Sequence, residues 1–173
     1  MRHNNGRRRT MNYFDIVDIV KSTIFPWNVK DWRDCDRTGW SIAHEAANRG
    51  RLPVWFDQWD IATRKGLTVA HVLARYWKLP KGFDKWDMRT NSGWTVAHAA
   101  ACSGNLPDDF DMWELAMDNG WSVAHAAAHY GTLPDGFCRW DIATNNGWTV
   151  ADEVAHKKRI KEKGYGREPK RFK

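Results

Sequence analysis

The sequence predicts an all-α protein, a helical repeat solenoid of about six short helix-turn-helix units. One observation is a block of 27 residues that recurs through most of the chain and opens each time on a glycine. Another is that a histidine, a Leu-Pro pair, a phenylalanine and a tryptophan return at fixed places within the blocks. Such a period indicates one supersecondary unit copied in tandem, each copy burying its apolar face against its neighbours. The opening glycines are Gly39, Gly66, Gly93, Gly120 and Gly147.

The period divides the chain into a degenerate first copy, four full copies and a truncated last copy. Phe25-Pro26 stands one period before Leu52-Pro53, so the first copy is predicted to cap the N-terminal end. The last copy loses the Leu-Pro half, as terminal repeats commonly deviate where they face solvent. The predicted boundaries are 1–11 for a basic N-terminal tail, 12–155 for the solenoid (12–38, 39–65, 66–92, 93–119, 120–146 and 147–155) and 156–173 for a basic C-terminal tail.

Each copy is expected to contain a short helix near its start. In the copy that begins at Gly93, Thr95 is a favourable N-cap residue, and the alanine-rich segment after it favours a helix. Gly104 is placed to end that helix in a left-handed conformation. Small residues such as Ala101 allow neighbouring helices to approach to about 8–10 Å. The N-cap position is occupied elsewhere by Ser41, Thr68, Ser122 and Thr149.

The second half of each copy is expected to form a short second helix or a 3₁₀ turn. Pro107 is tolerated in a first helical turn, and Phe110 and Trp113 follow it at successive steps of three residues. The stretch that comes next, for example 141–147, is rich in turn-forming residues and leads to the following helix. Little or no regular β-sheet is therefore expected.

The segment Thr95-Val96-Ala97-His98-Ala99-Ala100-Ala101, followed by Gly104, resembles the Thr-Pro-Leu-His-x-Ala-Ala-x-x-Gly core of the ankyrin repeat. The resemblance covers residues 39–155. The period is shorter than the roughly 33 residues of ankyrin, and Leu-Pro-x-x-Phe-x-x-Trp replaces most of the second helix. The resemblance implies a rigid protein-binding scaffold without catalytic residues, of a shortened kind found in bacterial and phage proteins.

The net charge of +6 conceals an uneven distribution. Residues 1–10 carry four arginines, and residues 156–173 carry nine lysines or arginines against two glutamates. The body between them has 14 basic and 19 acidic residues, a balance of −5. Three cysteines, Cys35, Cys102 and Cys138, form no metal-type pair and fit a reducing compartment, so a cytoplasmic location is expected. No stretch of sequence is long and apolar enough to cross a membrane.

The histidine ladder is the most prominent candidate for metal binding or catalysis. Its members, His44, His71, His98 and His125, lie one period apart and therefore about 10 Å from each other, which is too far for one metal ion. We expect each imidazole to make a hydrogen bond between repeats, with Asp152 serving as a capping acceptor in the last copy. No nucleophile motif or phosphate loop accompanies them, so no enzyme, metal or cofactor is expected.

Nine tryptophans obey the period and are expected to lie mostly in the core. Aromatic and basic residues that break the period are better candidates for partner contacts, because interface hot spots favour tryptophan, tyrosine and arginine. Trp77, for instance, stands where other copies have glycine. The alternative for Trp55 and Trp77 is that they fill gaps in the packing. The predicted contact set is Arg49, Trp55, Arg75, Tyr76, Trp77, His129 and Tyr130.

Charge also differs between adjacent copies, which is a way to orient a partner. The basic set is Arg75, Lys78, Lys81, Lys85 and Arg89, and the acidic set is Asp108, Asp109, Asp111, Glu114 and Asp118.

The predicted function is a non-enzymatic protein-binding scaffold. By its resemblance it is expected to be a phage or mobile-element protein that sequesters or inhibits a host factor, such as a defence component, in the host cytoplasm. One alternative is a nucleic-acid-associated accessory protein that binds through its tails, and another is a small-ligand sponge. The tail residues in question are Arg7, Arg8, Arg9, Lys157, Lys158 and Arg159.

Overall fold

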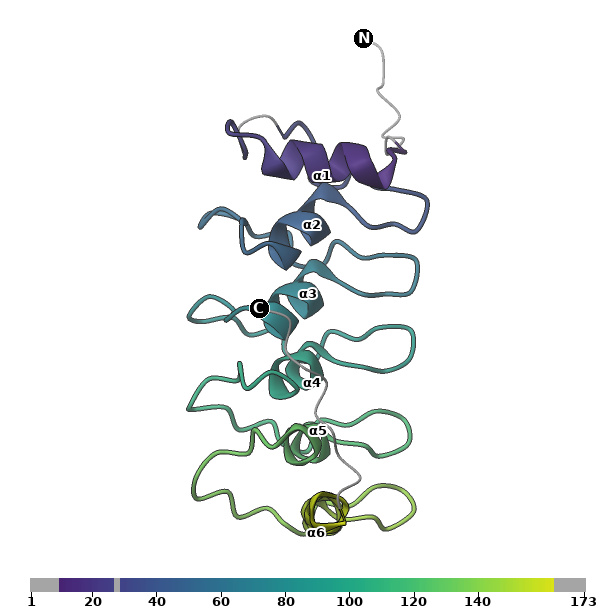
Figure 1. The fold of residues 1–173 in the computed structure, drawn as a ribbon, viewed down its shortest axis with the longest axis vertical. Coiled ribbons are helices and arrows are strands. Elements are labelled where there is room, and N and C mark those ends of the chain that lie inside the picture. Colours follow the sequence, from purple (N-terminus) through teal and green to yellow (C-terminus); the bar gives the residue numbers. More distant parts are fainter. Residues whose placement is uncertain (1–9, 27–28, 164–173) are drawn as a thin grey trace.

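The computed structural model describes residues 10–26 and 29–163. Within them the chain is all-helical, and six helices are stacked in chain order along one column (Figure 1). Each helix packs only against the helix before it and the helix after it in the described chain. The helices are α1 (Tyr13–Lys21), α2 (Ile42–Asn48), α3 (Val69–Tyr76), α4 (Val96–Ala101), α5 (Val123–Tyr130) and α6 (Val150–Glu162).

Each helix begins where the sequence predicts. The N-cap residues of α2 to α6 are Ser41, Thr68, Thr95, Ser122 and Thr149. Each of their side chains accepts a hydrogen bond from the backbone N–H of the third helical residue. The side chain of that third helical residue in turn accepts a hydrogen bond from the backbone N–H of the N-cap residue, which completes a capping box. These caps matter because helices of six to eight residues are too short to be stable on their own.

Glycines end several helices in the left-handed conformation. Gly131 is the C-cap of α5 with φ 74°, as expected of a residue without a Cβ. In α4 the C-cap is Cys102, and Gly104 (φ 68°) follows two residues later. There the amide of Asn105 donates to the carbonyl of Ala100 at 3.0 Å and closes the turn.

The second helix expected in each unit does not form in the described residues. The Leu-Pro segments are single turns, such as the one closed by the Phe110 amide and the Pro107 carbonyl at 3.1 Å. The physical reason is that only a few residues separate the proline from the buried phenylalanine. The chain must then extend to pack the next tryptophan against that phenylalanine. The units therefore contribute one helix each. Of the two predicted alternatives the second helix is absent from the described units, and a single turn closed between residues three apart stands in its place.

The described chain contains isolated β-bridges and no strand, as expected. One bridge closes the turn that precedes each helix from α2 onward, for example Arg89 with Thr95 and Ala116 with Ser122. These turns form one edge of the column in Figure 1, and the Leu-Pro segments form the opposite edge.

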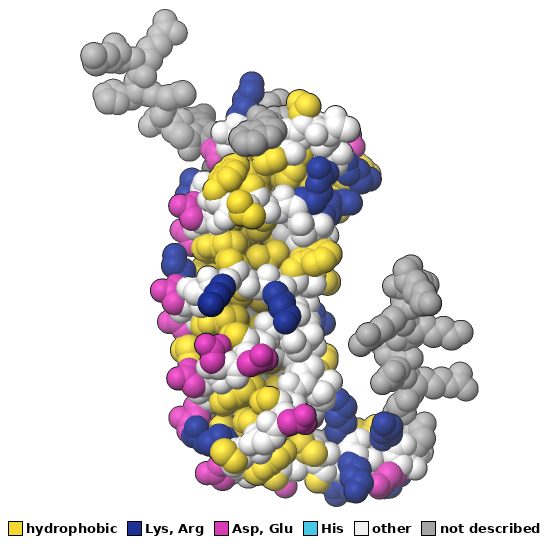
Figure 2. All heavy atoms as spheres, turned by 90° about the vertical axis from the view of Figure 1, so that its left-hand side faces the viewer, with side chains coloured by type: hydrophobic (Ala, Val, Ile, Leu, Met, Phe, Trp, Pro, Cys, Tyr) yellow, Lys and Arg dark blue, Asp and Glu magenta, His cyan; other side chains and the backbone are white. Residues whose placement is uncertain are grey.

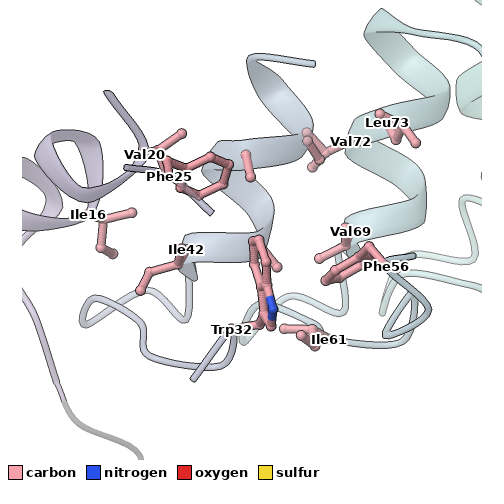
Figure 3. Packing of buried hydrophobic residues seen from close by; sticks show 13 residues of the cluster. Ile16, Val20, Phe25, Trp32, Ile42, Phe56, Ile61, Val69, Val72 and Leu73 are labelled. Carbon is pink, nitrogen blue, oxygen red and sulfur yellow. The ribbon is translucent and has the colours of Figure 1, made fainter. Parts of the chain in front are cut away.

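A continuous stack of aromatic rings runs through the Leu-Pro side. Phenylalanine and tryptophan alternate from Phe25 to Trp140, with centroids of successive rings 5.2–5.9 Å apart and interplanar angles of 74–90°. Edge-to-face pairs of this kind add about 0.5–1.5 kcal/mol beyond the burial of area. Figure 3 shows the first part, where Trp32 lies among Phe56, Ile42 and Ile61.

The expectation of mostly buried tryptophans holds only in part. Trp32 is buried, while Trp59, Trp86 and Trp113 are half-buried and Trp140 is 41% exposed.

The last helix is longer than the sequence analysis predicts. Helix α6 continues to Glu162, so residues 156–162 are helical and do not belong to a tail. The cause is local, because Lys158 occupies the position at which Gly50, Gly104 and Gly131 terminate other helices. The predicted boundary at residue 155 therefore falls within α6.

Candidate functional site

The four histidines of the ladder are buried and join consecutive units. In each, Nδ1 accepts a hydrogen bond from the N-cap hydroxyl of its own helix at 2.6–2.8 Å. Nε2 donates to a backbone carbonyl of the following unit at 2.9–3.1 Å. The acceptors are the carbonyls of Leu67, Trp94, Trp121 and Trp148. This is the inter-repeat hydrogen bond that the sequence predicts.

Burial lowers the pKa of His44, His71 and His98 because it disfavours the charged imidazolium. The pKa falls to about 4 for His44 and His98, and that of His71 is also lowered. The hydrogen bond to the backbone carbonyl opposes this effect without reversing it. In His44 and His98 both ring nitrogens are hydrogen-bonded, and the lowered pKa favours the neutral imidazole that this pair of bonds requires.

Asp152 takes the place of histidine in the last unit. Its Oδ2 accepts from the Thr149 amide at 3.0 Å and from the Thr149 hydroxyl at 2.7 Å. These hydrogen bonds lower the pKa of the carboxyl. No unit follows α6 in the described structure, so a histidine here would have no backbone carbonyl to which its Nε2–H could donate. A carboxylate has no N–H and needs no such acceptor. The capping role expected of Asp152 is confirmed.

Trp77 occupies a position where its neighbours have a helix-ending glycine. It caps α3 in an extended conformation, with φ −140° and ψ 166°. Its indole lies over Gly50 so closely that a Cβ at Gly50 would be 2.7 Å from the ring, and its Nε1 donates to the Asn48 carbonyl at 3.3 Å. Trp77 remains 48% exposed in spite of this contact. It therefore both packs against the preceding unit and presents an aromatic face to solvent.

Three further large side chains are exposed in this unit and the one before it. Val54 is fully exposed, Tyr76 is 59% exposed and Trp55 is 53% exposed. The ring of Trp55 packs edge-to-face against Trp32, 6.1 Å between centroids. We call Val54, Trp55, Tyr76 and Trp77 the Trp77 surface.

A groove of about 240 Å³ is part of this surface, with Val54 and Trp77 on its walls and Leu52, Pro53 and Pro80 beside them. On the Leu-Pro side of the column, hydrophobic side chains form a long stripe that acidic residues border along one edge (Figure 2).

Arg75 and Tyr130 meet although α4 lies between their helices. The guanidinium of Arg75 is 5.6 Å from the centroid of the Tyr130 ring, within the range of a cation–π interaction. The intervening helix allows this because it carries small side chains there, Cys102 and Ser103. Burial raises the pKa of the Cys102 thiol, which interacts with both partners. The structure thus unites two of the predicted contact residues that are two units apart.

Arg49 and His129 hold buried carboxylates at opposite ends of the column. The Nε of Arg49 donates to Glu45, which also accepts from the Trp40 indole at 3.2 Å. At the other end Nδ1 of His129 lies 2.7 Å from Oε1 of Glu153. The indole of Trp148 donates to Glu153 at 3.0 Å. Both predicted contact residues are therefore engaged within the fold.

The predicted charge contrast lies across a groove of about 490 Å³. Lys78 and Lys81 line one wall, and Asp108, Asp109 and Asp111 line the other. This groove shares Lys78 and Pro80 with the one beside Trp77, so the two adjoin on the Leu-Pro side. The two open surfaces together offer apolar contact at one level and charges of both signs at the next.

The tail residues divide between described and other parts of the chain. Arg7, Arg8 and Arg9 lie outside the described residues. Lys157, Lys158 and Arg159 lie on α6. Across 10–26 and 29–163, no group of three or more histidine, cysteine or acidic side chains is arranged to hold a metal ion.

Sequence reasoning missed Val54 and the two buried glutamates. Val54 follows a Leu-Pro pair at a position that varies between copies, and nothing in the pattern marks it. Glu45 and Glu153 did leave a signal, because the central copies have Val72, Ala99 and Ala126 there. A charged residue at a position that is apolar elsewhere indicates either a functional group or a modified end of the stack.

Comparison of the chain with models of known protein families, and with curated proteins, gives no match. No helix in the part of the chain that the structure describes combines the length and the apolar character that crossing a bilayer requires.

Proposed function

We propose that this chain is a non-enzymatic protein-binding scaffold, an ankyrin-like solenoid of shortened repeats that acts by occupying a surface of another protein. The observation that carries the proposal is the Trp77 surface. Its exposed aromatic and aliphatic side chains break the repeat pattern, and the stacking of helices does not require them to be exposed. Exposed aromatic clusters beside a groove are typical of interface anchors.

The class of partner follows from the chemistry of this surface. A segment with apolar side chains would fill the groove between Val54 and Trp77, and charges flanking that segment would meet Lys78 and Lys81 or the acidic wall opposite. We further propose that the partner is a host factor, such as a defence component, which a phage or mobile-element protein sequesters. This part rests on the likeness to shortened ankyrin repeats.

The test is affinity capture from a host lysate with the full chain and two variants. Val54→Asp combined with Tyr76→Ala removes exposed apolar area from the Trp77 surface. Phe14→Ala is the matched control, because Phe14 is 76% exposed on α1 and lies outside this surface. We expect a reproducible protein to be retained by the parent and by the control and lost from the double variant, with unchanged melting curves. Equal retention by all three would reject the Trp77 surface.

The second candidate is nucleic-acid binding through basic residues, favoured by their helical arrangement on α6, where Lys157, Lys158, Arg159 and Lys161 follow closely. Binding of this kind should weaken steeply with salt, since each phosphate contact releases counterions. It should also vanish from a chain without residues 1–10 and 156–173. Capture through the Trp77 surface should survive both treatments, so one salt series distinguishes the two functions.

A further inference from the structure

A third open groove lies at the C-terminal end of the column, where the aromatic stack stops. It has a volume of about 450 Å³. Apolar side chains of Leu133, Pro134, Trp140 and Val154 line it together with three lysines. We call it the C-terminal groove. Its full lining is Ala128, Gly131, Leu133, Pro134, Trp140, Val154, Lys157, Lys158 and Lys161.

In the described residues the groove is open because no Leu-Pro-x-x-Phe segment follows Trp140 at the expected period. In the preceding units, each tryptophan of the aromatic stack packs edge-to-face against the phenylalanine of the next Leu-Pro segment. Trp113 and Phe137 are an example, with 5.2 Å between their ring centroids. The corresponding stretch after Trp140 reads Ile160-Lys-Glu-Lys-Gly164, with no Leu-Pro-x-x-Phe. Trp140 therefore has the Phe137 of its own unit as a ring neighbour and stays 41% exposed.

On α6, Val154 is likewise exposed at a position that is buried in the earlier helices. The residues one to four periods earlier, Ala127, Ala100, Leu73 and Ala46, are all at most 8% exposed, whereas Val154 is 37% exposed. Lysines border this apolar floor, and the Nζ of Lys157 lies near Gly131. Figure 2 shows basic side chains gathered at this end of the column, in contrast to the acidic edge above them.

We infer that the C-terminal groove binds an acidic segment of a partner protein that supplies the missing aromatic residue. The aromatic ring packs edge-to-face on Trp140, as phenylalanine does in every earlier unit, and aliphatic or proline residues cover Val154 and Leu133. Carboxylates of the segment pair with Lys157, Lys158 and Lys161. The charge complementarity selects an acidic occupant, and the interrupted ring stack selects an aromatic one. This groove is separate from the Trp77 surface.

The chain itself provides matched probes. A fluorescein-labelled peptide with the sequence of residues 105–112, Asn-Leu-Pro-Asp-Asp-Phe-Asp-Met, carries the acidic form of the motif. The peptide of residues 78–85, Lys-Leu-Pro-Lys-Gly-Phe-Asp-Lys, carries the same motif with mostly basic side chains. A third peptide replaces the phenylalanine of the first with alanine. We expect fluorescence anisotropy with the full chain to show at least tenfold weaker binding for the second and third peptides.

Substitutions in the protein locate the site. Lys158→Glu combined with Lys161→Glu, and separately Trp140→Ala, should each weaken binding of the acidic peptide about tenfold. Lys163→Glu is the control, because Lys163 caps α6 outside the groove and should leave binding unchanged. Val154→Asp provides a second apolar variant if Trp140→Ala lowers the melting temperature. Val54→Asp with Tyr76→Ala should have no effect, which separates this site from the proposed function.

Several results would overturn the inference. Equal binding of the acidic peptide and its alanine variant would remove the aromatic requirement. An equal loss of peptide affinity in the Lys163→Glu control would show that the effect comes from the net charge of the protein and not from the lysines of the groove. Oligouridine is the test for nucleic-acid binding. If it displaces the peptide and binds the parent and the Trp140→Ala variant equally well, the lysines form a nucleic-acid site.

Discussion

Each ladder histidine uses both ring nitrogens, Nδ1 within its own unit and Nε2 toward the following unit. His98 accepts from the Thr95 hydroxyl on one side and donates to the Trp121 carbonyl on the other. A proton on Nδ1 would place an N–H against that hydroxyl and against the Thr95 amide, which also points at Nδ1. The buried site has no carboxylate among its hydrogen-bond partners to stabilise the imidazolium. Protonation is therefore coupled to unfolding.

The fold should consequently lose stability in acid. The pKa of His44 and His98 is lowered to about 4 in the folded chain, from 6.5 for the free side chain. The unfolded chain then binds more protons than the folded one as the pH drops below 6.5. The histidine contribution is fully present above pH 6.5 and is lost as the pH falls toward 4, by on the order of 3 kcal/mol for each residue. Urea unfolding at pH 7.5, 6, 5 and 4 measures it.

Replacing His98 by alanine tests the same assignment by another route. The change leaves the buried Trp121 carbonyl without its donor and opens a cavity, which should cost about 2–4 kcal/mol of unfolding free energy. The loss of stability between pH 6.5 and 4 should also become smaller. His156→Ala, at an exposed position on α6, is the control and should change neither. A stoichiometric metal that disappears with His98 would contradict the structural role.

Helix ends determine how adjacent units fit together. Gly50 and Gly104 occupy equivalent positions, with φ 63° and 68°, but only Gly50 has an indole lying over it. A Cβ at Gly104 would meet the Thr132 side chain at an ordinary 3.5 Å, whereas one at Gly50 would be 2.7 Å from the Trp77 ring. The two glycines share the same backbone requirement and differ in their packing.

Gly104→Ala should therefore cost about 1–2 kcal/mol, the strain of a left-handed alanine. Gly50→Ala should cost more, because Trp77 must also move. In a double-mutant cycle with Trp77→Ala, the additional cost at Gly50 should disappear. Thermal unfolding of the four chains supplies the measurement. Equal costs at both glycines would show that Trp77 does not rest on Gly50 in solution.

At the scale of the whole column, packing between the described helices is confined to nearest neighbours, so α1 and α6 each pack against one described helix. The aromatic stack and the histidine bonds both run along the column and end at its last unit. Stability should therefore be highest in the middle. Local opening follows the number of buried contacts that must be broken.

Hydrogen exchange followed by mass spectrometry should reveal this gradient. We expect the amides of α3 and α4 to exchange most slowly and those of α6 beyond Glu153, where the side chains face solvent, to exchange fastest. The acidic peptide of residues 105–112 should slow exchange in the last segment if it occupies the C-terminal groove. Uniform protection from α1 to α6 would mean that the column opens only as a whole.

The sequence by itself determined the all-helical class, the N-caps, the inter-unit histidine bond and the capping role of Asp152. These features depend on local spacing, which the 27-residue period displays directly. The tertiary structure alone decided which side chains stay open. Trp77 is half-exposed because Gly50 supports only one of its faces, and Arg75 reaches Tyr130 because Cys102 and Ser103 are small.

The same distinction explains where the structure differs from the sequence predictions. The second helix is absent because aromatic packing between units extends the Leu-Pro segment, and α6 continues past residue 155 because Lys158 replaces a terminating glycine. The groove beside Trp140 is open because no Leu-Pro-x-x-Phe segment follows Trp140 in the described residues, whereas one follows the corresponding tryptophan of each earlier unit. A repeat pattern specifies the side chains that each unit provides. The exposure of those side chains at the end of a stack depends on whether another unit packs over them.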